Sequence, residues 1–363
     1  KSGAAGGWKG LSFGDATDFG GLASSLNYLT VEKAGQSNTL GGSIAAVSAD
    51  ILFINTGTTF TINNVQANGG SGNGFYLSGS QLTTTSAKAQ NNAGNGLFAV
   101  SSTLSASGMT ISGNAGNGVQ LSSSGGTLSA STISSNASYG IDTSGGSPSL
   151  TNNTISQNGK YAIRYPVGNA PVITGNTLSS NTNPGIEIVG GALTTSHTWA
   201  LQNGEQVFTV TSGEVVVHNL ATLTVAAGVT VKFASGSALI IGYYVYDQGQ
   251  VNSVERGKLV VNGTAAQRVL FTAKNGQSGG WKGLSFGSAT DYAGLTSSVS
   301  YLTVERGGQA QTLGGSIGAV SANILLFNTG TSFAFTGVES NYGSGAGVYT
   351  SGSVLPWTGG GAK

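Results

Sequence analysis

A row of three charged residues is the part of this sequence whose types and spacing come closest to acid–base chemistry. Asp142, Arg164 and Glu187 occupy the same position in three successive repeats of the chain. In a stacked repeat with about 4.8 Å between coils, the two carboxylates would be about 9.6 Å apart. That separation lies at the outer edge of the range used by inverting glycosidases. The alternative is a surface ion-pair ladder with the cation between two acids.

The ladder is the favoured interpretation. A guanidinium at Arg164 would keep both neighbouring carboxylates ionised and lower their pKa values, which is the opposite of what a general acid needs. Residues 51–159 contain only two charged side chains, Lys88 and Asp142, which is too few for acid–base work across several coils. The two histidines have no metal-ligand spacing around them. The sequence therefore predicts a protein that is not an enzyme and has no metal and no cofactor.

These side chains depend on a repeat that organises the middle of the chain. One asparagine recurs at a nearly constant interval, with an aliphatic residue at the fifth position after each: Asn92, Asn114, Asn136, Asn158 and Asn181. A fixed period of this length marks a stacked-repeat architecture. We expect these asparagines to be structural, to adopt a left-handed backbone at a bend, and to bond one another through their amides.

The elements that carry this repeat are short. Each unit has two or three Thr-, Ile- and Ser-rich segments separated by Gly or Asn, which predicts strands and corners rather than helices. A coil of about 22 residues with three short strands is the unit of a right-handed parallel β-helix. The chain resembles the right-handed β-helix repeat family, which shares the pectin-lyase-like fold. The resemblance implies an all-β solenoid and says little about function.

A longer repeat is superimposed on the coils. Residues 8–82 and 281–355 align without a gap at a shift of 273, with 49 identities in 75 positions. We therefore expect one continuous β-helix over 1–363, made of a complete super-repeat at 1–273 and a partial second copy at 274–363. Such arrays are stabilised mainly by contacts between neighbouring repeats.

The segment that joins the two copies carries a further resemblance. Its ordered blocks at 223–233, 257–265, 269–272 and 280–284 resemble a segment of large, often adhesin-like bacterial surface proteins with β-helix repeats. This resemblance implies an extracellular or cell-surface location. The chain departs from the pattern by an insertion that is expected to form a surface loop and that contains Tyr243, Tyr244, Tyr246 and Asp247. This loop could bind a glycan, or it could pack against the molecule or a neighbouring chain.

Composition limits the classes of partner. A net charge of +1 with 7% charged residues argues against nucleic acid and against a polybasic membrane contact. No apolar run is long enough to span a bilayer. Threonines at 83–85 and 194–195 are not expected to form a flat array at the coil period.

The predicted function is a secreted structural segment, such as a stalk, an adhesin shaft or a fibre. Stacked coils have unpaired backbone groups at both ends, so we expect head-to-tail contacts with copies of the chain or with adjacent repeats. A polysaccharide-active enzyme and a glycan-binding module remain the alternatives.

Overall fold

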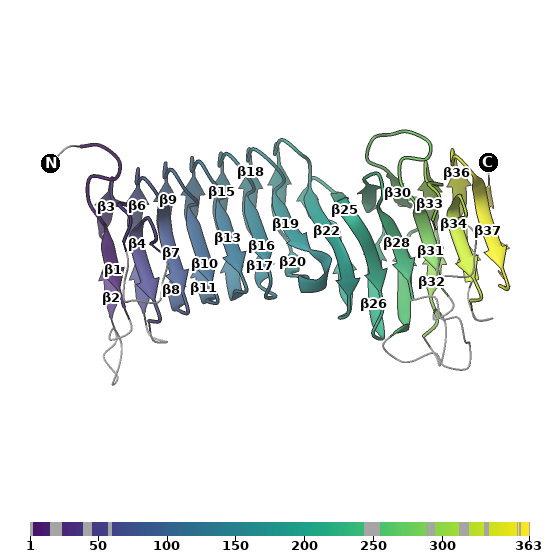
Figure 1. Cartoon of the computed structure of the whole chain (residues 1–363), viewed down its shortest axis with the longest axis horizontal. Helices are drawn as coiled ribbons and strands as arrows, with labels where there is room; N and C mark the ends of the chain where they lie inside the picture. Colours follow the sequence, from purple (N-terminus) through teal and green to yellow (C-terminus); the bar gives the residue numbers. More distant parts are fainter. Residues whose placement is uncertain are drawn as a thin grey trace. The chain divides into compact units, whose positions relative to one another are not determined.

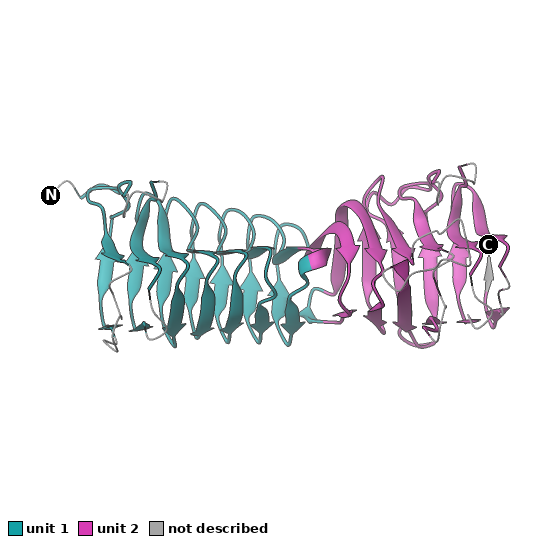
Figure 2. Ribbon diagram, turned by 60° about the horizontal axis from the view of Figure 1, so that its bottom comes forward, with its two compact units in different colours: residues 1–165, 169–186, 202–205 teal, residues 166–168, 187–201, 206–363 magenta. Residues whose placement is uncertain are grey.

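Parallel strands stacked in coils make up the protein in the computed structural model (Figure 1). The structure describes residues 3–14, 24–38, 46–56, 60–242, 255–287, 290, 295–311, 319–329, 334–353, 355 and 357–362. The chain divides into two compact units, coloured separately in Figure 2. Unit 1 comprises residues 1–165, 169–186 and 202–205, and unit 2 comprises residues 166–168, 187–201 and 206–363.

Unit 1 consists of three columns of parallel strands, and each coil contributes one strand to each column. The first column contains β1 (Leu11–Phe13), β4 (Ala49–Ile54), β7 (Asn73–Ser78), β10 (Leu97–Val100), β13 (Val119–Ser122), β16 (Ile141–Ser144) and β19 (Ile163–Pro166). The second contains β2 (Ser25–Asn27), β5 (Thr61–Asn63), β8 (Gln81–Thr84), β11 (Thr103–Ser107), β14 (Gly125–Ser129), β17 (Ser149–Thr151) and β20 (Val172–Thr174). The third contains β3 (Thr30–Glu32), β6 (Gln66–Asn68), β9 (Lys88–Gln90), β12 (Thr110–Ser112), β15 (Thr132–Ser134), β18 (Thr154–Ser156), β21 (Thr177–Ser179) and β24 (Asn203–Gly204).

The core of unit 1 is formed by the alternation of side chains along these short strands. In the third column, one aliphatic residue per strand points inward, and strand pairing places Ile111, Ile133, Ile155 and Leu178 directly in register. All four are fully buried. The flanking Thr and Ser of each strand point outward, because successive side chains of a strand face opposite sides. The predicted aliphatic column is therefore confirmed.

Unit 2 has the same three-column construction with a different beginning. Strand β25 (Val207–Val217) is long enough to start two columns, since its first half pairs with β27 and its second half with β28. One column continues with β27 (Thr230–Phe233), β30 (Val269–Ala273), β33 (Leu302–Glu305), β36 (Glu339–Asn341) and β39 (Gly361–Ala362). Another continues with β28 (Ala238–Ile241), β31 (Gly283–Phe286), β34 (Ala322–Phe327) and β37 (Ala346–Ser351). The third contains β23 (His197–Trp199), β26 (Ala221–Ala226), β29 (Gly257–Asn262), β32 (Ser298–Ser300), β35 (Ala334–Thr336) and β38 (Trp357–Thr358).

Two elements fall where the chain passes from one unit to the other. They are β22 (Ile186–Leu193) and a 3-10 helix at Val167–Asn169. The 3-10 helix is a single turn, and the described residues contain no α-helix. The all-β parallel β-helix predicted from the sequence is thus confirmed.

Coil length is less uniform than the sequence period predicted. In the middle of unit 1, strand pairing joins each residue to its counterpart one period later, as with Val119 and Ile141. At the start of the unit, however, Leu11 pairs with Ile51, so this coil is nearly twice as long. An antiparallel bridge between Asn38 and Val47 lies within it. The described residues Asn38 and Val47 therefore pair with each other, outside the three columns of parallel strands.

The two copies of the super-repeat have matching strands. At the shift of 273, β31 to β37 correspond in order to β1 to β7, and most of their bounds agree to within one residue. Left-handed backbone positions recur as well. Tyr28 and Tyr301, with φ of 54° and 47°, occupy one such pair, and Gly10 and Gly283, with φ of 94° and 120°, occupy another. Equivalent residues of the two copies therefore have equivalent backbone positions.

Candidate functional site

The five predicted asparagines form one buried column in unit 1. The side-chain amide nitrogen of each donates to the amide oxygen of the next at distances of 3.0, 2.9, 3.0 and 3.0 Å, in the order Asn92, Asn114, Asn136, Asn158, Asn181. Each of the first four also donates its backbone N–H to the same oxygen. None is more than 7% exposed. The asparagines therefore bond each coil to the next rather than facing a ligand.

Asn136 illustrates how fully these side chains are used. Its Nδ2 donates to Asn158 Oδ1 at 3.0 Å and to the Ile111 carbonyl at 3.3 Å. Its Oδ1 accepts from the backbone N–H of Asn114 at 3.1 Å and from Asn114 Nδ2 at 2.9 Å. Donors and acceptors are balanced, as burial requires.

The backbone at these corners differs from the prediction. The left-handed conformation occurs one residue before each asparagine, at Asn91, Gly113, Ser135, Gln157 and Ser180, with φ between 55° and 69°. The ladder asparagines themselves have no positive φ. The prediction of a left-handed ladder asparagine was therefore wrong. The turn falls on the preceding residue, and the asparagine side chain that follows it is buried inside the coil.

A carboxylate terminates the ladder. Asn181 donates its backbone N–H to Glu205 Oε1 at 3.3 Å, and its Nδ2 lies 3.5 Å from Glu205 Oε2. The Gly185 N–H donates to the same Oε2 at 2.7 Å. An ionised carboxylate only accepts hydrogen bonds, so it can end a column in which every amide also donates. Sequence reasoning missed Glu205, because it does not fall on the asparagine period.

Two further buried ladders run through the other corners of unit 1. In one, backbone N–H groups donate to the next hydroxyl at 3.0 to 3.1 Å, through Thr56, Ser80, Ser102 and Ser124. The other uses amides after its first member and runs through Ser131, Asn153, Asn176 and Gln202. The members of these two ladders recur in the sequence at about the coil period. This recurrence could not be recognised, because serine is so common in the chain.

The predicted charged row is divided between the two units. In unit 1, Arg164 Nη1 lies 2.8 Å from Asp142 Oδ1, and the two residues are register partners on β19 and β16. The Tyr139 ring lies 5.7 Å from the Arg164 guanidinium. Glu187 belongs to unit 2, where its Oε1 accepts from Thr211 Oγ1 at 2.6 Å and its side chain is almost fully buried. The structure therefore brings Asp142 and Arg164 together and pairs Glu187 with a hydroxyl.

Hydroxyl side chains line the outward face of the second column in unit 1. Strand pairing places Thr61, Thr83, Ser105, Thr127 and Ser149 in one row along the coil axis. The prediction that threonines 83–85 have no counterpart at the coil period was therefore too narrow. The period is kept, but serine takes the place of threonine at two of the five positions.

A shallow hollow of about 210 Å³ lies on this hydroxyl face. Strands β8, β11 and β14 and the residues just after β8 supply its walls. It contains no charged side chain and is lined by Thr83, Thr84, Thr85, Ser105, Ala106, Ser107, Thr127 and Ser129. Such a surface offers hydroxyl donors and acceptors to an uncharged polar ligand.

The predicted glycan-binding loop with Tyr243, Tyr244, Tyr246 and Asp247 lies outside the described residues. Within the described ranges, no group of three His, Asp or Glu side chains is arranged to hold a metal ion. In those same ranges no helix is long and apolar enough to cross a membrane. Burial lowers the pKa of His197 to about 4, so this imidazole is neutral at neutral pH.

One buried acid has no role in the ladders. Asp50, at the start of β4, is fully buried, and neither carboxyl oxygen makes a hydrogen bond of good geometry. Burial raises the pKa of Asp50 to about 7, and the Ala34 backbone N–H opposes this effect more weakly. The side chain packs so closely that a Cβ on Gly70 would lie 2.1 Å from Asp50 Oδ1. Asp50 is therefore held as a neutral acid below about pH 7.

The second copy has an amide at the equivalent position. Asn323 is also fully buried, and its Oδ1 accepts from the Gly307 N–H at 2.7 Å. Its Nδ2 donates to the Asn341 carbonyl at 2.9 Å and to Ser340 Oγ at 3.1 Å. Asp50 makes no hydrogen bonds of this kind, so the two copies use this backbone position differently.

Comparison with known families agrees with this construction. Residues 99–245 match the family model described as a right-handed β-helix region. The parallel strands stacked before and after that segment are built in the same way, so the chain is a right-handed parallel β-helix. Comparison with the curated proteins and with the solved structures gives no match.

Proposed function

We propose that this protein is a structural segment of a repetitive extracellular or cell-surface protein, acting as a stalk, shaft or fibre and not as an enzyme. The observation that carries the proposal is the use of the polar side chains in unit 1. Three buried ladders bond each coil to the next and leave little functional chemistry exposed. The matching strands of the two super-repeat copies support the same conclusion, because a shaft grows by adding units.

The resemblance of residues 223–284 to adhesin-like surface proteins supports the location. Contacts with copies of the chain or with adjacent repeats follow from the open strand edges of a stacked coil. Nucleic acid is not proposed as a partner, because a net charge of +1 gives little attraction to phosphates.

Electron microscopy and sedimentation of the purified chain test this function. A shaft should give elongated particles, and self-association should increase with protein concentration. Incubation with a panel of polysaccharides tests the enzyme alternative. Cleavage that disappears in Arg164→Ala or Asp142→Asn would contradict the structural function, because these residues would then act in a reaction.

Carbohydrate binding is a second candidate, favoured by the hollow on the hydroxyl face. Its lining of hydroxyls without charge suits the hydroxyl groups of a neutral glycan. The proposed variant is Ser105→Lys, which places a long cation across the hollow. Thr132→Lys, on the outward face of β15, is the matched control. Glycan binding lost only in Ser105→Lys supports the candidate, whereas equal binding by both variants and the parent contradicts it.

A further inference from the structure

The first coil of the chain exposes residues that its second copy buries. Trp8 is 40% exposed, whereas the equivalent Trp281 is fully buried. Leu11 and Phe13 are half-buried, and their equivalents Leu284 and Phe286 are fully buried. Tyr28 is 86% exposed, and Tyr301 is only half-buried. The residue types are the same in both copies, so the difference arises from what covers them.

In unit 2, this surface is covered by the coil of strands β28, β29 and β30 and by residues of the coil before it. The ring of Phe233 stacks on Trp281, with 4.2 Å between centroids and 9° between planes. Strand β28 pairs with β31 and places Leu239 and Ile241 beside Leu284 and Phe286. The other two columns continue in the same way, since β29 pairs with β32 and β30 with β33. The three strands of one coil therefore cover the first coil of the second copy.

The polar contacts of this junction are equally specific. Lys282 Nζ lies 2.6 Å from Glu214 Oε1. The Gln309 side chain donates to Ser235 Oγ at 2.9 Å and accepts from the Gly236 N–H at 2.8 Å. The first copy has the same types at these positions, Lys9 and Gln36, and both are exposed. The exposed face of the first copy therefore carries the same polar side chains that contact the covering segment in the second copy.

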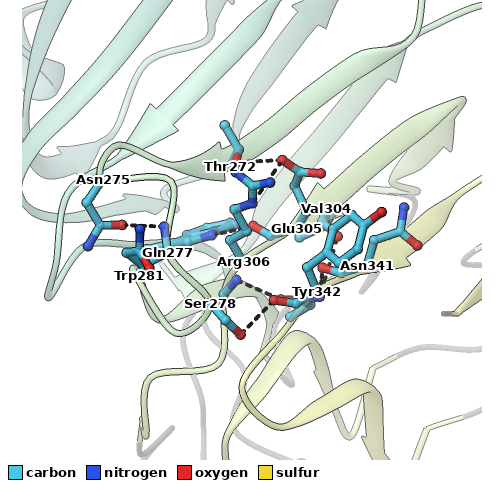
Figure 3. Close-up of polar contacts among 12 residues, drawn as sticks. Thr272, Asn275, Gln277, Ser278, Trp281, Val304, Glu305, Arg306, Asn341 and Tyr342 are labelled. Carbon is cyan, nitrogen blue, oxygen red and sulfur yellow. Dashed lines mark hydrogen bonds and ion pairs between the residues drawn. The ribbon is translucent and has the colours of Figure 1, made fainter.

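Figure 3 shows a further contact of the same junction. Thr272, on the covering strand β30, donates to Glu305 Oε1 at 2.9 Å, and the Trp281 indole N–H donates to the Glu305 carbonyl at 2.9 Å. In the first copy, the Trp8 indole N–H already donates to the Glu32 carbonyl at 3.0 Å. The Glu32 side chain, however, is exposed. The indole N–H of this tryptophan therefore makes the same hydrogen bond in both copies, although only Trp281 is covered.

We infer that the exposed face of the first coil binds a segment with the chemistry of residues 207–273, supplied by a tandem copy of this repeat. The inference rests on the proposed function and identifies the segment that binds the exposed face of the first coil. Strands β37, β38 and β39 do not supply the matching contacts, because they follow the pattern of the coil that begins at β7. Nor can an intact second chain offer its own residues 207–273, because they already cover the coil that begins at β31.

A fusion protein tests the inference. Residues 190–273 are placed directly before Lys1, which reproduces the Ala273–Lys274 junction because Lys1 is equivalent to Lys274. The control fusion carries residues 97–186, the asparagine coils, at the same place. The readout is the quenching of Trp8 fluorescence by acrylamide, obtained by subtracting the signal of the matching Trp8→Phe variant. We expect Trp8 to become as protected as Trp281 in the first fusion and to stay accessible in the control.

Disulfide formation provides a second measurement, because the chain contains no cysteine. Ile240 and Ser285 are register partners in adjacent parallel strands, a separation that suits a disulfide. Ile240→Cys in the added segment and Ser12→Cys in the first coil should therefore crosslink. Ile241→Cys in the added segment, combined with Ser12→Cys, should form no disulfide, because residue 241 points to the opposite face of the strand.

Each result of the fusion experiment either supports or contradicts the inference. Trp8 that stays accessible while the added Trp199 is protected would overturn it, because the segment would then be folded but not docked. Failure of the added segment to protect its own Trp199 would also contradict it, since the face is inferred to hold this coil. Separately, Phe233→Ala in the parent chain should raise the quenching of Trp281 toward that of Trp8. The fusion results do not depend on particle shape or glycan cleavage, so they can fail or succeed independently of the proposed function.

Discussion

At the scale of single residues, unit 1 is defined by amides that bond in a chain along the coil axis. Each ladder asparagine donates to one neighbour and accepts from the other, and each is buried. A buried amide can adopt this role only when both neighbours are present, because an unpaired buried donor or acceptor costs free energy. The ladder therefore enforces the register of successive coils.

The first prediction removes one amide from the ladder. Asn136→Ala removes the acceptor of the Asn114 backbone N–H and of one Asn114 Nδ2 hydrogen, together with the Nδ2 hydrogen bonds to Asn158 Oδ1 and the Ile111 carbonyl. The free energy of unfolding should fall by roughly 3 kcal/mol or more. Ser134→Ala, two positions earlier and facing outward, should change it by less than about 0.5 kcal/mol. Equal effects in urea unfolding would show that the ladder is not required for stability.

The second prediction concerns pH and Asp50. The pKa of this carboxyl is about 7 in the folded protein and 3.8 when exposed. A folded-state pKa above the unfolded value means that the folded state binds the proton more tightly. The contribution of protonated Asp50 to the free energy of unfolding is therefore fully present below about pH 4. It is lost as the pH rises through 7, by roughly 4 kcal/mol at most.

Reciprocal variants test this pH dependence. Asp50→Asn should flatten the decrease in unfolding free energy between about pH 4 and about pH 8, because an amide does not titrate. Asn323→Asp should introduce a second decrease of the same sign, since Asn323 donates to a backbone carbonyl that a carboxylate would repel. A parent protein whose stability is constant across this range would contradict the assignment.

At the scale of the strand, two-residue alternation decides which side chains form the core. In β15 the central Ile133 is fully buried, while Thr132 on the same strand faces outward and is exposed. The same pattern occurs in β12, β18 and β21, which places four aliphatic residues in register. The same substitution therefore affects the core at one position and only the surface at the next position along the strand.

The third prediction exploits this alternation. Ile133→Asp places an unpaired carboxylate in the core and should destabilise unit 1 by more than about 4 kcal/mol. Thr132→Asp introduces the same charge one position earlier and should cost less than about 0.5 kcal/mol. Thermal unfolding followed by circular dichroism compares the two. Similar melting of Ile133→Asp and the parent would mean that the assigned coil phase is wrong.

At the scale of the whole molecule, each compact unit has its own stack of coils and its own core. In a repeat protein each coil contacts mainly its sequence neighbours, so stability is approximately a sum of local terms. Damage to one coil should therefore be felt nearby and fade with distance along the chain. This behaviour differs from the all-or-none unfolding of a small globular domain.

The fourth prediction follows from this locality. In Ile133→Asp, hydrogen exchange measured by mass spectrometry should accelerate in β12, β15 and β18. Exchange in the strands β26 and β29 of unit 2 should remain close to that of the parent. Uniform acceleration across both units would indicate that the chain unfolds as a single cooperative body.

The coil could be predicted from the sequence, because the pattern that specifies it is local and periodic. The regular spacing of the asparagines and the inward aliphatic residues are sufficient to predict a parallel β-helix and the column of asparagines. The serine ladder has the same period, but it could not be separated from the many exposed serines of the chain. Glu205 could not be predicted as the ladder's end, because nothing local distinguishes it from a surface acid.

The burial and hydrogen bonding of individual positions could not be predicted in the same way. Trp8 and Trp281 have the same neighbours in sequence, yet one is 40% exposed and the other is fully buried. Asp50 and Asn323 occupy the same backbone position, yet only the amide completes its hydrogen bonds. Burial and hydrogen bonding depend on the coil that lies next in space, which the sequence around a residue does not specify.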